Sequence, residues 1–256
     1  MTNTMDYIFL DTETTGNGEE DRLVQLAWYC EKAGFREGLF KPPLPIKYGA
    51  MGVHHITNDA VEDKPPFQGS GMYDALNGLL TEGFVIVAHN ARFDVEMLRK
   101  EGMVIDRYVD TLKLARKHVT PTDSHSLQAL KYRLNLDQTL LDDATAHDAA
   151  GDVAVLYELF RYLKRKAVED GAIPTAAEGD PALDEYFLKS CEPSLLDVIA
   201  FGKHKGMKFE DVAKEHMDYL WWLSDQPGQK DPDLLFTLSH YLEGHARDES
   251  EPFRST

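Results

Sequence analysis

Hydrophobic residues along the chain form short continuous runs in some segments and spacings of three and four in others, which predicts strands and helices respectively. The runs are bounded by glycine, proline and acidic residues, and they predict strands at Tyr7–Leu10, Leu23–Cys30, Phe35–Phe40 and Phe84–Ala88. The helical spacing predicts helices at Asp74–Leu80, Ala91–Glu101, Asp110–Lys117, Ser126–Leu134 and Ala146–Lys166. Strands concentrated early and helices late, with one strand-to-helix crossover, indicate an α/β fold.

The pattern weakens after residue 168, where alanine, glycine, proline and acidic residues dominate. We therefore predict a first domain over residues 1–168 and a linker over residues 169–193 with at most one helical segment. Apolar residues return over residues 194–245, which predicts a small C-terminal domain. Residues 246–256 have the composition of a solvated tail.

Composition excludes several classes of protein. Hydrophobic residues make up 43% of the 256 residues, enough to build a core. The longest strongly apolar run, FVIVA at Phe84–Ala88, is far shorter than the ~18–20 residues that span a bilayer, so we expect no membrane partner. The first residues, MTNTMDY, do not resemble a signal peptide. Cys30 and Cys191 form no CxxC motif, which argues against a disulfide framework and favours the cytoplasm.

The formal net charge of −17 taken alone disfavours a nucleic-acid partner, because such proteins normally carry a basic surface. Most of the excess acidity, however, lies after residue 168. Acidic residues that bind cations would reduce the charge of the first domain further. The net charge therefore does not exclude DNA.

Three acidic motifs occur at positions where α/β proteins place their sites. Asp11 and Glu13 are two apart at the end of the first strand, so both side chains project from the same face. Asp94, in AHNARFD, opens the helix that follows the buried strand at Phe84–Ala88. His147 and Asp152, in AHDAAGD, open the long helix. Carboxylates gathered at a strand end suit Mg²⁺ or Mn²⁺.

The order of these motifs resembles the DnaQ-like 3′–5′ exonucleases, in the DEDDh subgroup of the ribonuclease H-like fold. The segments VHHIT, DTLKLAR and SLQALKYRLNL resemble the same family, and FGKHKG and YLWWL resemble the C-terminal region of a stand-alone member. The resemblance implies a mixed five-stranded sheet flanked by helices, together with a small C-terminal domain. It covers nearly the whole chain except the linker, the tail and an acidic stretch, EEDR, after the first motif.

The resemblance also implies the site. Asp11 would bridge two Mg²⁺ ions, Glu13 and Asp152 would complete one metal site, and Asp94 would bind the other ion. Mn²⁺ is expected to substitute for Mg²⁺. His147 would be the general base, since imidazole titrates near neutrality. A related subgroup has tyrosine four residues before the last aspartate, but Asp148 stands there in this chain.

Substrate contacts are expected around the same edge. By resemblance, Thr14 lies near the 3′ terminus, His55 and Ile56 belong to a loop that wedges against the terminal base, and Asn90 lies near the scissile phosphate. His89 stands beside Asn90 at the strand exit, where α/β sites commonly form. Asp110 is expected to cap a helix.

The C-terminal region contains FGKHKGMKF, in which glycines predict a tight hairpin and Lys203, Lys205 and Lys208 are interleaved with aromatic residues. Such a pattern suits single-strand binding through phosphate contacts and base stacking. A solvated hairpin explains Lys203 and Lys205 equally well at this stage. The Trp221–Trp222 pair is expected to belong to a small core.

These observations predict a metal-dependent 3′–5′ exodeoxyribonuclease that releases nucleoside monophosphates from single-stranded or frayed 3′ ends by two-metal hydrolysis. Two alternatives remain open: a 3′–5′ exoribonuclease, since no residue decisively reads the 2′-hydroxyl, and a proofreading subunit of a DNA polymerase. A non-catalytic binding module is disfavoured because all five site residues are present. The oligomeric state is not determined, and a homodimer is one alternative.

Overall fold

The computed structural model describes residues 5–136, 149–173, 180–199, 201–226 and 231–245. It divides into two compact units, Met1–Cys191 and Glu192–Thr256. Each is described separately below. No helix in the described ranges is long and apolar enough to cross a membrane.

The first unit is built on a mixed five-stranded sheet, which confirms the predicted fold class. Its strands are ordered β3-β2-β1-β4-β5. β1 runs antiparallel to β2, and β2 antiparallel to β3, whereas β1, β4 and β5 are parallel. The bounds are Tyr7–Thr14, Leu23–Cys30, Gly34–Leu39, Val85–Ala88 and Tyr108–Asp110. The sequence pattern did not locate β5, because three residues are too few to show an alternation.

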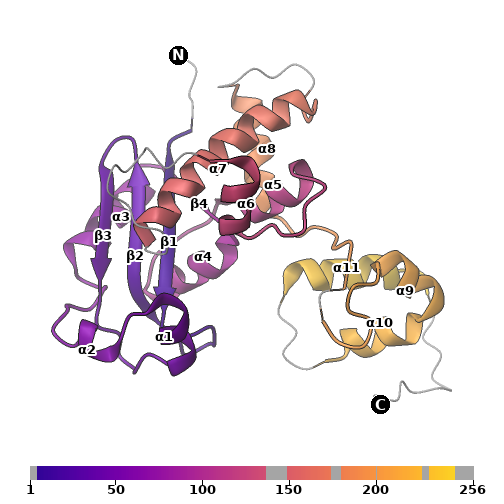
Figure 1. Ribbon diagram of the computed structural model, residues 1–256, viewed down its shortest axis with the longest axis horizontal. Helices are drawn as coiled ribbons and strands as arrows, with labels where there is room; N and C mark the ends of the chain where they lie inside the picture. The colour runs from indigo at the N-terminus through magenta and orange to yellow at the C-terminus, as the bar shows by residue number, and fades with distance from the viewer. Residues whose placement is uncertain (1–4, 137–148, 174–179, 200, 227–230, 246–256) are drawn as a thin grey trace. The chain divides into compact units, whose positions relative to one another are not determined.

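Helices cover both faces of this sheet (Figure 1). α3, α4, α5 and α6 begin within three residues of the predicted starts, and three of them have side-chain caps at Ser70, Asp110 and Ser126. α1 and α2 were not predicted, since α1 buries no residue and α2 is a single turn. The bounds are Tyr48–His54, Asn58–Val61, Gly71–Thr81, Ala91–Lys100, Thr111–His118, Leu127–Leu134 and, for α7, Ala149–Glu169.

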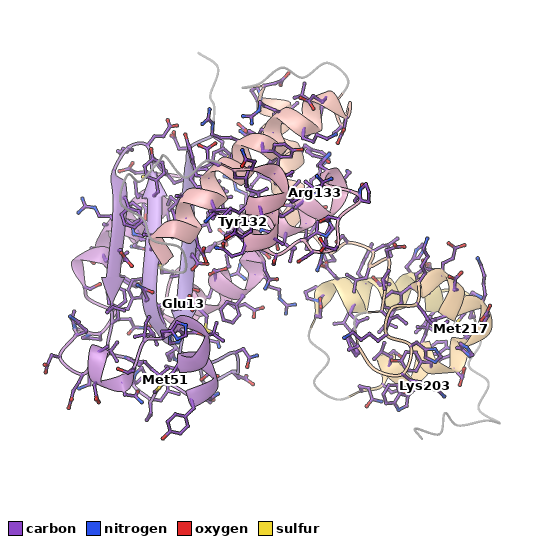
Figure 2. The ribbon with its side chains drawn as sticks, in the orientation of Figure 1. Glu13, Met51, Tyr132, Arg133, Lys203 and Met217 are labelled. Carbon is purple, nitrogen blue, oxygen red and sulfur yellow. The ribbon has the colours of Figure 1, made fainter. Side chains whose placement is uncertain are left out.

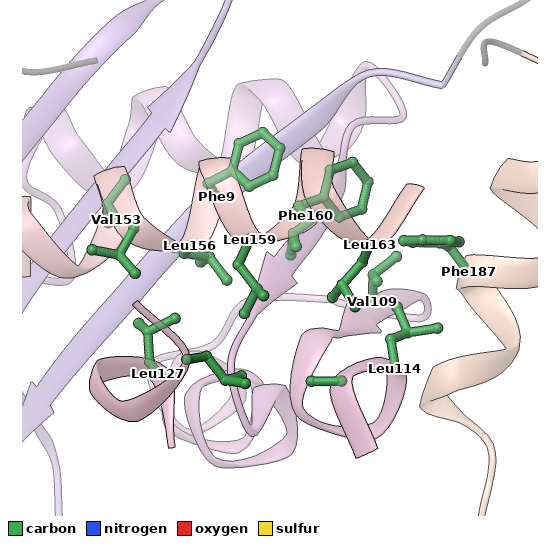
Figure 3. Packing of buried hydrophobic residues seen from close by; sticks show 14 of the residues in the cluster. Phe9, Val109, Leu114, Leu127, Val153, Leu156, Leu159, Phe160, Leu163 and Phe187 are labelled. Atoms are coloured by element: carbon green, nitrogen blue, oxygen red, sulfur yellow. The ribbon is translucent and has the colours of Figure 1, made fainter. Parts of the chain in front are cut away.

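The alternation of β1 divides the hydrophobic residues into two cores. Phe9 points to the face covered by α7, where its ring makes edge contacts with Tyr157 and Phe160 (Figure 3). Ile8 and Leu10 point to the opposite face, which α3 and α4 cover. Because side chains alternate along a strand, every second residue of β1 faces α7, including the acidic residues beyond Phe9.

The predicted linker over residues 169–193 is wrong in its second half. α8, Pro181–Leu188, and a 3₁₀ turn, Lys189–Cys191, belong to the first unit. Phe187 has no exposed surface and packs against Phe160. Asp184 accepts hydrogen bonds from the Tyr7 hydroxyl at 2.7 Å and from Lys164 at 2.6 Å. A composition rich in acid and alanine concealed a helix whose apolar residues are buried by tertiary contacts.

The second unit is a small helical domain built from α9, Phe209–Glu215, α10, Met217–Ser224, and α11, Pro232–Leu242. Phe209, Tyr219 and Leu220 are buried in its core. Trp221 and Trp222 pack against the core as partly buried residues, in agreement with the expectation for this pair. Backbone hydrogen bonds join residues 197–199 to residues 206–209 as a tight hairpin.

Candidate active site

Asp11 and Glu13 lie near the C-terminal end of β1, where they pair with Ala27 and Gln25 of β2. They are on the same face as Phe9, and therefore project toward α7. The pairing register shifts between Glu13 and Thr14, so the strand ends directly after the second carboxylate. Figure 2 shows Glu13 at this end of the sheet.

Asp94 reaches the same end of the sheet from α4. Its side chain is 4% exposed, and its Oδ1 accepts hydrogen bonds from the Thr12 backbone at 3.1 Å and the Thr12 hydroxyl at 2.7 Å. Thr12 lies between the two acidic residues of β1, and its side chain points to the opposite face of the strand. Thr12 therefore holds Asp94 from that opposite face. The sequence alone indicated no role for Thr12, although its polar side chain at a buried strand position was a signal.

Asp152 reaches the site from the first turn of α7. Its Oδ1 accepts a hydrogen bond from Nε2 of Gln128 on α6. Gln128 was not predicted as a site residue. A polar residue two positions after the Ser126 cap, within an otherwise apolar helix start, was the available signal. His147, the predicted base, lies outside the described residues.

The carboxylates perturb one another. Burial, followed by the charges of Asp94, Asp152 and Glu13, raises the pKa of Asp11 well above its usual range. Burial and the charge of Asp152 raise the pKa of Glu13 to about 7. Burial raises the pKa of Asp94 to about 7 despite its hydrogen bonds from Thr12. The fold therefore brings four acidic side chains from three elements into one electrostatic group.

A divalent cation fits the chemistry of this donor set, because hard oxygen ligands and uncompensated negative charge favour Mg²⁺ or Mn²⁺. Within the part of the chain that the structure describes, no three His, Cys, Asp or Glu side chains are arranged to hold a metal ion as they stand. Asp94 and Asp152 are each hydrogen-bonded through Oδ1.

The loop after α1 contacts the end of β1. Nε2 of His54 lies 3.1 Å from the Thr14 carbonyl oxygen, and the Ile56 backbone donates to His54 Nδ1 at 3.0 Å. Because Nδ1 accepts, Nε2 carries the proton and donates to Thr14. His55 is exposed in a left-handed conformation, with φ of 61°, whereas Ile56 is half-buried. Thr14 is buried, and its hydroxyl donates to the Gly16 carbonyl at 2.7 Å.

His89 and Asn90 leave β4 at the same edge but differ in orientation. His89 lies within hydrogen-bonding distance of Thr111 and of the His125 carbonyl, so its ring is engaged within the protein. Asn90 is exposed and left-handed, with φ of 66°, and its backbone donates to Asp110 Oδ1 at 3.1 Å. Asp110 also accepts from Leu112, which confirms the predicted cap.

Residues 8–160 match the family model described as exonuclease, which is more than half of the chain and includes every element of this site. The chain belongs to the exonuclease family.

Curated relatives of this exonuclease agree with that assignment. This chain is 29% identical over 216 residues to exodeoxyribonuclease 10 of Escherichia coli strain K12, and the alignment covers 80% of this chain and 83% of the relative. It is 29% identical over 177 residues to the DNA polymerase III subunit epsilon of Buchnera aphidicola, covering 60% and 70%. A solved structure, exonuclease X in complex with 5′ overhanging duplex DNA, aligns with a TM-score of 0.48 and 24% identity over 69% of this chain and 98% of that chain.

A buried aspartate stabilises the segment next to the exonuclease site, and it was not predicted from the sequence. Asp21, within the acidic stretch EEDR, has no exposed surface. It accepts hydrogen bonds from the Thr15 hydroxyl at 2.8 Å, from the Gly18 backbone at 2.7 Å and from Lys47 at 2.5 Å. No role was predicted for EEDR, which lies outside the family resemblance. The hydrogen bonds from Thr15, Gly18 and Lys47 distinguish Asp21 from the exposed Glu19 and Glu20 beside it.

Lys203 and Lys205, the other predicted substrate contacts, lie in the second unit (Figure 2 labels Lys203). Both side chains are exposed. The four carboxylates belong to the first unit.

Proposed function

We propose that this exonuclease is a metal-dependent 3′–5′ exodeoxyribonuclease that releases nucleoside monophosphates from single-stranded or frayed DNA ends. The supporting observation is that Asp11, Glu13, Asp94 and Asp152 form one electrostatic group at the end of β1, in which burial and neighbouring carboxylates raise the pKa values of Asp11 and Glu13, and burial raises that of Asp94. The relative named exodeoxyribonuclease 10 supports DNA as the substrate.

Two Mg²⁺ ions, or Mn²⁺ in their place, would be held by these carboxylates, with Asp11 shared, Glu13 and Asp152 on one ion and Asp94 on the other. Bound there, the ions would lower the pKa of a water and neutralise charge on the phosphodiester. Thr12 and Gln128 orient Asp94 and Asp152 through the hydrogen bonds described above. His147 is proposed as the general base on the strength of its sequence position.

The 3′ end is proposed to lie against the end of β1. Thr14, His55 and Ile56 border this end, and Asn90 stands exposed beside Asp94 on α4. His54 supports the arrangement, since its ring links the loop containing His55 and Ile56 to the Thr14 carbonyl. His89 contributes by holding the strand exit, because both of its nitrogens face groups of the protein.

The proposal is tested with a 5′-labelled oligonucleotide. A 3′–5′ exonuclease shortens the labelled strand progressively and releases 5′-mononucleotides, whereas a 5′–3′ enzyme releases the label at once. Mg²⁺ or Mn²⁺ should support the reaction and EDTA should stop it. Asp11→Asn and Asp152→Asn should lose about a hundred- to a thousandfold in rate, comparable to removing one key electrostatic group. Asp106→Asn, an exposed aspartate outside the group, is the matched control.

The same assay separates the alternatives. Matched DNA and RNA strands at fixed salt distinguish an exodeoxyribonuclease from an exoribonuclease. Preference for a mispaired primer terminus within duplex DNA, and stimulation by a polymerase, would favour a proofreading subunit. Release of label from the 5′ end, or activity that persists in EDTA, would contradict the mechanism.

A further inference from the structure

The second unit presents a hairpin in which residues 197–199 pair with residues 206–209. The Ile199 backbone donates to Met207 at 2.9 Å, Gly206 donates to Ile199 at 2.8 Å, and Phe209 donates to Asp197 at 2.9 Å. Val198 and Lys208 form an antiparallel bridge. These bonds define a two-sided element, because bridged residues share a face while their neighbours point to the other.

The inner face of this hairpin is anchored in the core of the unit. His204, at the tip, is 6% exposed, and its ring centroid lies 4.5 Å from those of both His216 and Tyr219. Gly202 approaches so closely that a Cβ there would stand 2.7 Å from the Tyr219 hydroxyl, and its φ of +73° also favours glycine. Ile199 is buried on the same side. The tip is therefore fixed in position by contacts beneath it.

The outer face is basic and partly apolar. Lys203 and Lys205 flank the buried His204, and both are exposed, as is Lys208. Beside them Val198 is 41% and Phe201 45% exposed. Among the residues that the structure describes, neither Lys205 nor Lys208 forms an ion pair, whereas Lys214 on α9 pairs with Glu210 at 2.5 Å. The hairpin thus places three exposed lysines in one short segment with an exposed aromatic ring.

We propose that this outer face, formed by Val198, Phe201, Lys203, Lys205 and Lys208, binds single-stranded nucleic acid. Lysines contact the phosphates, and Phe201 stacks on an unpaired base. A duplex could bind the lysines through its phosphates, but it would offer no base to stack on the Phe201 ring, because its bases are already stacked and paired. The anchored tip favours binding, since the contacts of Gly202 and His204 fix the backbone that carries Lys203 and Lys205 before the strand arrives.

This face would bind the strand, in addition to the four carboxylates that act on its 3′ end. The second unit would therefore bind a strand whose 3′ end is the substrate of the first unit. The inference rests on the proposed function only for the identity of that strand. Because binding is measurable without cleavage, its failure and the failure of the proposed function are distinguishable.

The binding experiment uses the full chain, EDTA to prevent hydrolysis, and fluorescence anisotropy of a labelled oligothymidylate longer than the ~16 nucleotides that such surfaces cover. Lys205→Ala is compared with Lys214→Ala, since both remove one exposed charge from the same unit. Lys205→Ala should weaken binding about 3- to 10-fold and lower the salt slope by about 0.7, the value for one phosphate contact on a single strand. Lys214→Ala should change neither.

Phe201 variants test stacking separately from charge. Phe201→Ala should weaken binding at least about fivefold, the lower end of the effect of one stacked base. Phe201→Tyr should restore it, whereas Phe201→Leu should not, because leucine is apolar without a planar π-face. Duplex DNA of the same length should be insensitive to all three variants.

Turnover gives a second readout. For the long oligothymidylate, Lys205→Ala should raise KM with kcat unchanged, because the hairpin contributes to binding rather than to chemistry. Hydrolysis of a p-nitrophenyl ester of thymidine 5′-monophosphate, too short to span both units, should be unaffected. Wild-type binding by Lys205→Ala and Phe201→Ala, equal effects of Phe201→Tyr and Phe201→Leu, or preferential binding of anionic vesicles would overturn the proposal.

Discussion

Lys47 Nζ lies 2.5 Å from Oδ2 of Asp21, whose side chain is completely buried while that of Lys47 is 58% exposed. Asp21 ends the loop that follows β1, and Lys47 is the residue before α1. The Lys47 backbone also donates to the Thr15 carbonyl at 3.0 Å. The ion pair therefore joins the segment after Glu13 to the helix that carries His54, the two elements proposed to border the 3′ end.

Asp21→Asn should weaken this junction. The amide replaces one carboxylate oxygen by a donor, so at least one of the donors from Thr15, Gly18 and Lys47 loses its acceptor. We expect a loss of about 1–3 kcal/mol in the free energy of unfolding, typical of a buried unsatisfied polar group. KM for DNA should rise more than kcat falls, because the variant displaces substrate-binding segments. Urea unfolding and steady-state kinetics measure both.

A matched control is Lys32→Met, which removes an ion pair with Glu82 in which both side chains are about half exposed. Its effect on stability should stay below about 1 kcal/mol, as for other exposed pairs. Equal effects of Asp21→Asn and Lys32→Met would contradict a structural role for Asp21.

His89 should make the protein sensitive to acid. Nε2 lies 2.8 Å from the His125 carbonyl, which only accepts, and Nδ1 lies 3.0 Å from the Thr111 hydroxyl, which is also within 3.1 Å of the Ala88 carbonyl. All three hydrogen bonds form together only when both ring nitrogens carry protons. Burial opposes that charge and lowers the pKa of His89 to about 4.

The sign of the pH effect follows from this shift. The unfolded chain binds a proton at His89 near pH 6.5, but the folded chain does so only near pH 4. Stability from this residue is therefore fully present above about pH 6.5 and decreases toward pH 4, by at most about 1.4 kcal/mol per pH unit. His89→Gln should remove that slope, while the exposed His240→Gln should retain it. Parallel stability curves for wild type and His89→Gln would contradict the assignment.

Phe187→Ala should destabilise the first unit strongly. Phe187 has no exposed surface, and its ring centroid lies 5.3 Å from that of Phe160 on α7. Loss of a fully buried phenylalanine typically costs about 3–5 kcal/mol. Tyr132→Ala, at a 77% exposed position of α6, should cost less than about 0.5 kcal/mol. An unchanged unfolding midpoint for Phe187→Ala would contradict the assignment of residues 181–191 to the first unit and would indicate a linker there.

Divalent cations should stabilise the folded chain. The charges of Asp94, Asp152 and Glu13 add to burial in raising the pKa of Asp11, so a cation bound among them relieves repulsion. A hundredfold excess over the dissociation constant should contribute about 2.7 kcal/mol, seen as a rise in Tm that EDTA reverses.

Asp11→Asn gives a test that does not depend on activity. In EDTA it should be more stable than wild type, because one repulsive charge has gone, yet its Tm should respond less to Mg²⁺. Asp106→Asn and a matched increase in monovalent salt are the controls. A Tm of Asp11→Asn that is lower than wild type in EDTA would contradict mutual repulsion among the carboxylates.

The sequence by itself determined the α/β class and the membership of the exonuclease family. Four of the five strands and the long helix were predicted from uninterrupted or periodic apolar residues, because such patterns depend on local spacing alone. Asp11, Glu13, Asp94 and Asp152 were selected because the order of their motifs along the chain resembles that of a known family; each motif alone was a weak signal. His147 was selected by the same motif spacing.

Tertiary structure determined the features that depend on contacts between residues far apart in the chain. Acidic composition was a poor guide to Asp21 and α8, because burial of Asp21 depends on Lys47 and burial of Phe187 depends on α7. Thr12 and Gln128 acquire their roles only when α4 and α7 deliver Asp94 and Asp152 to them. At the FGKHKG hairpin, the sequence did not show which of the basic and aromatic side chains are buried and which are exposed. The fold separated them by burying His204 and leaving Phe201 exposed, since one face of any hairpin packed on a core remains in solvent.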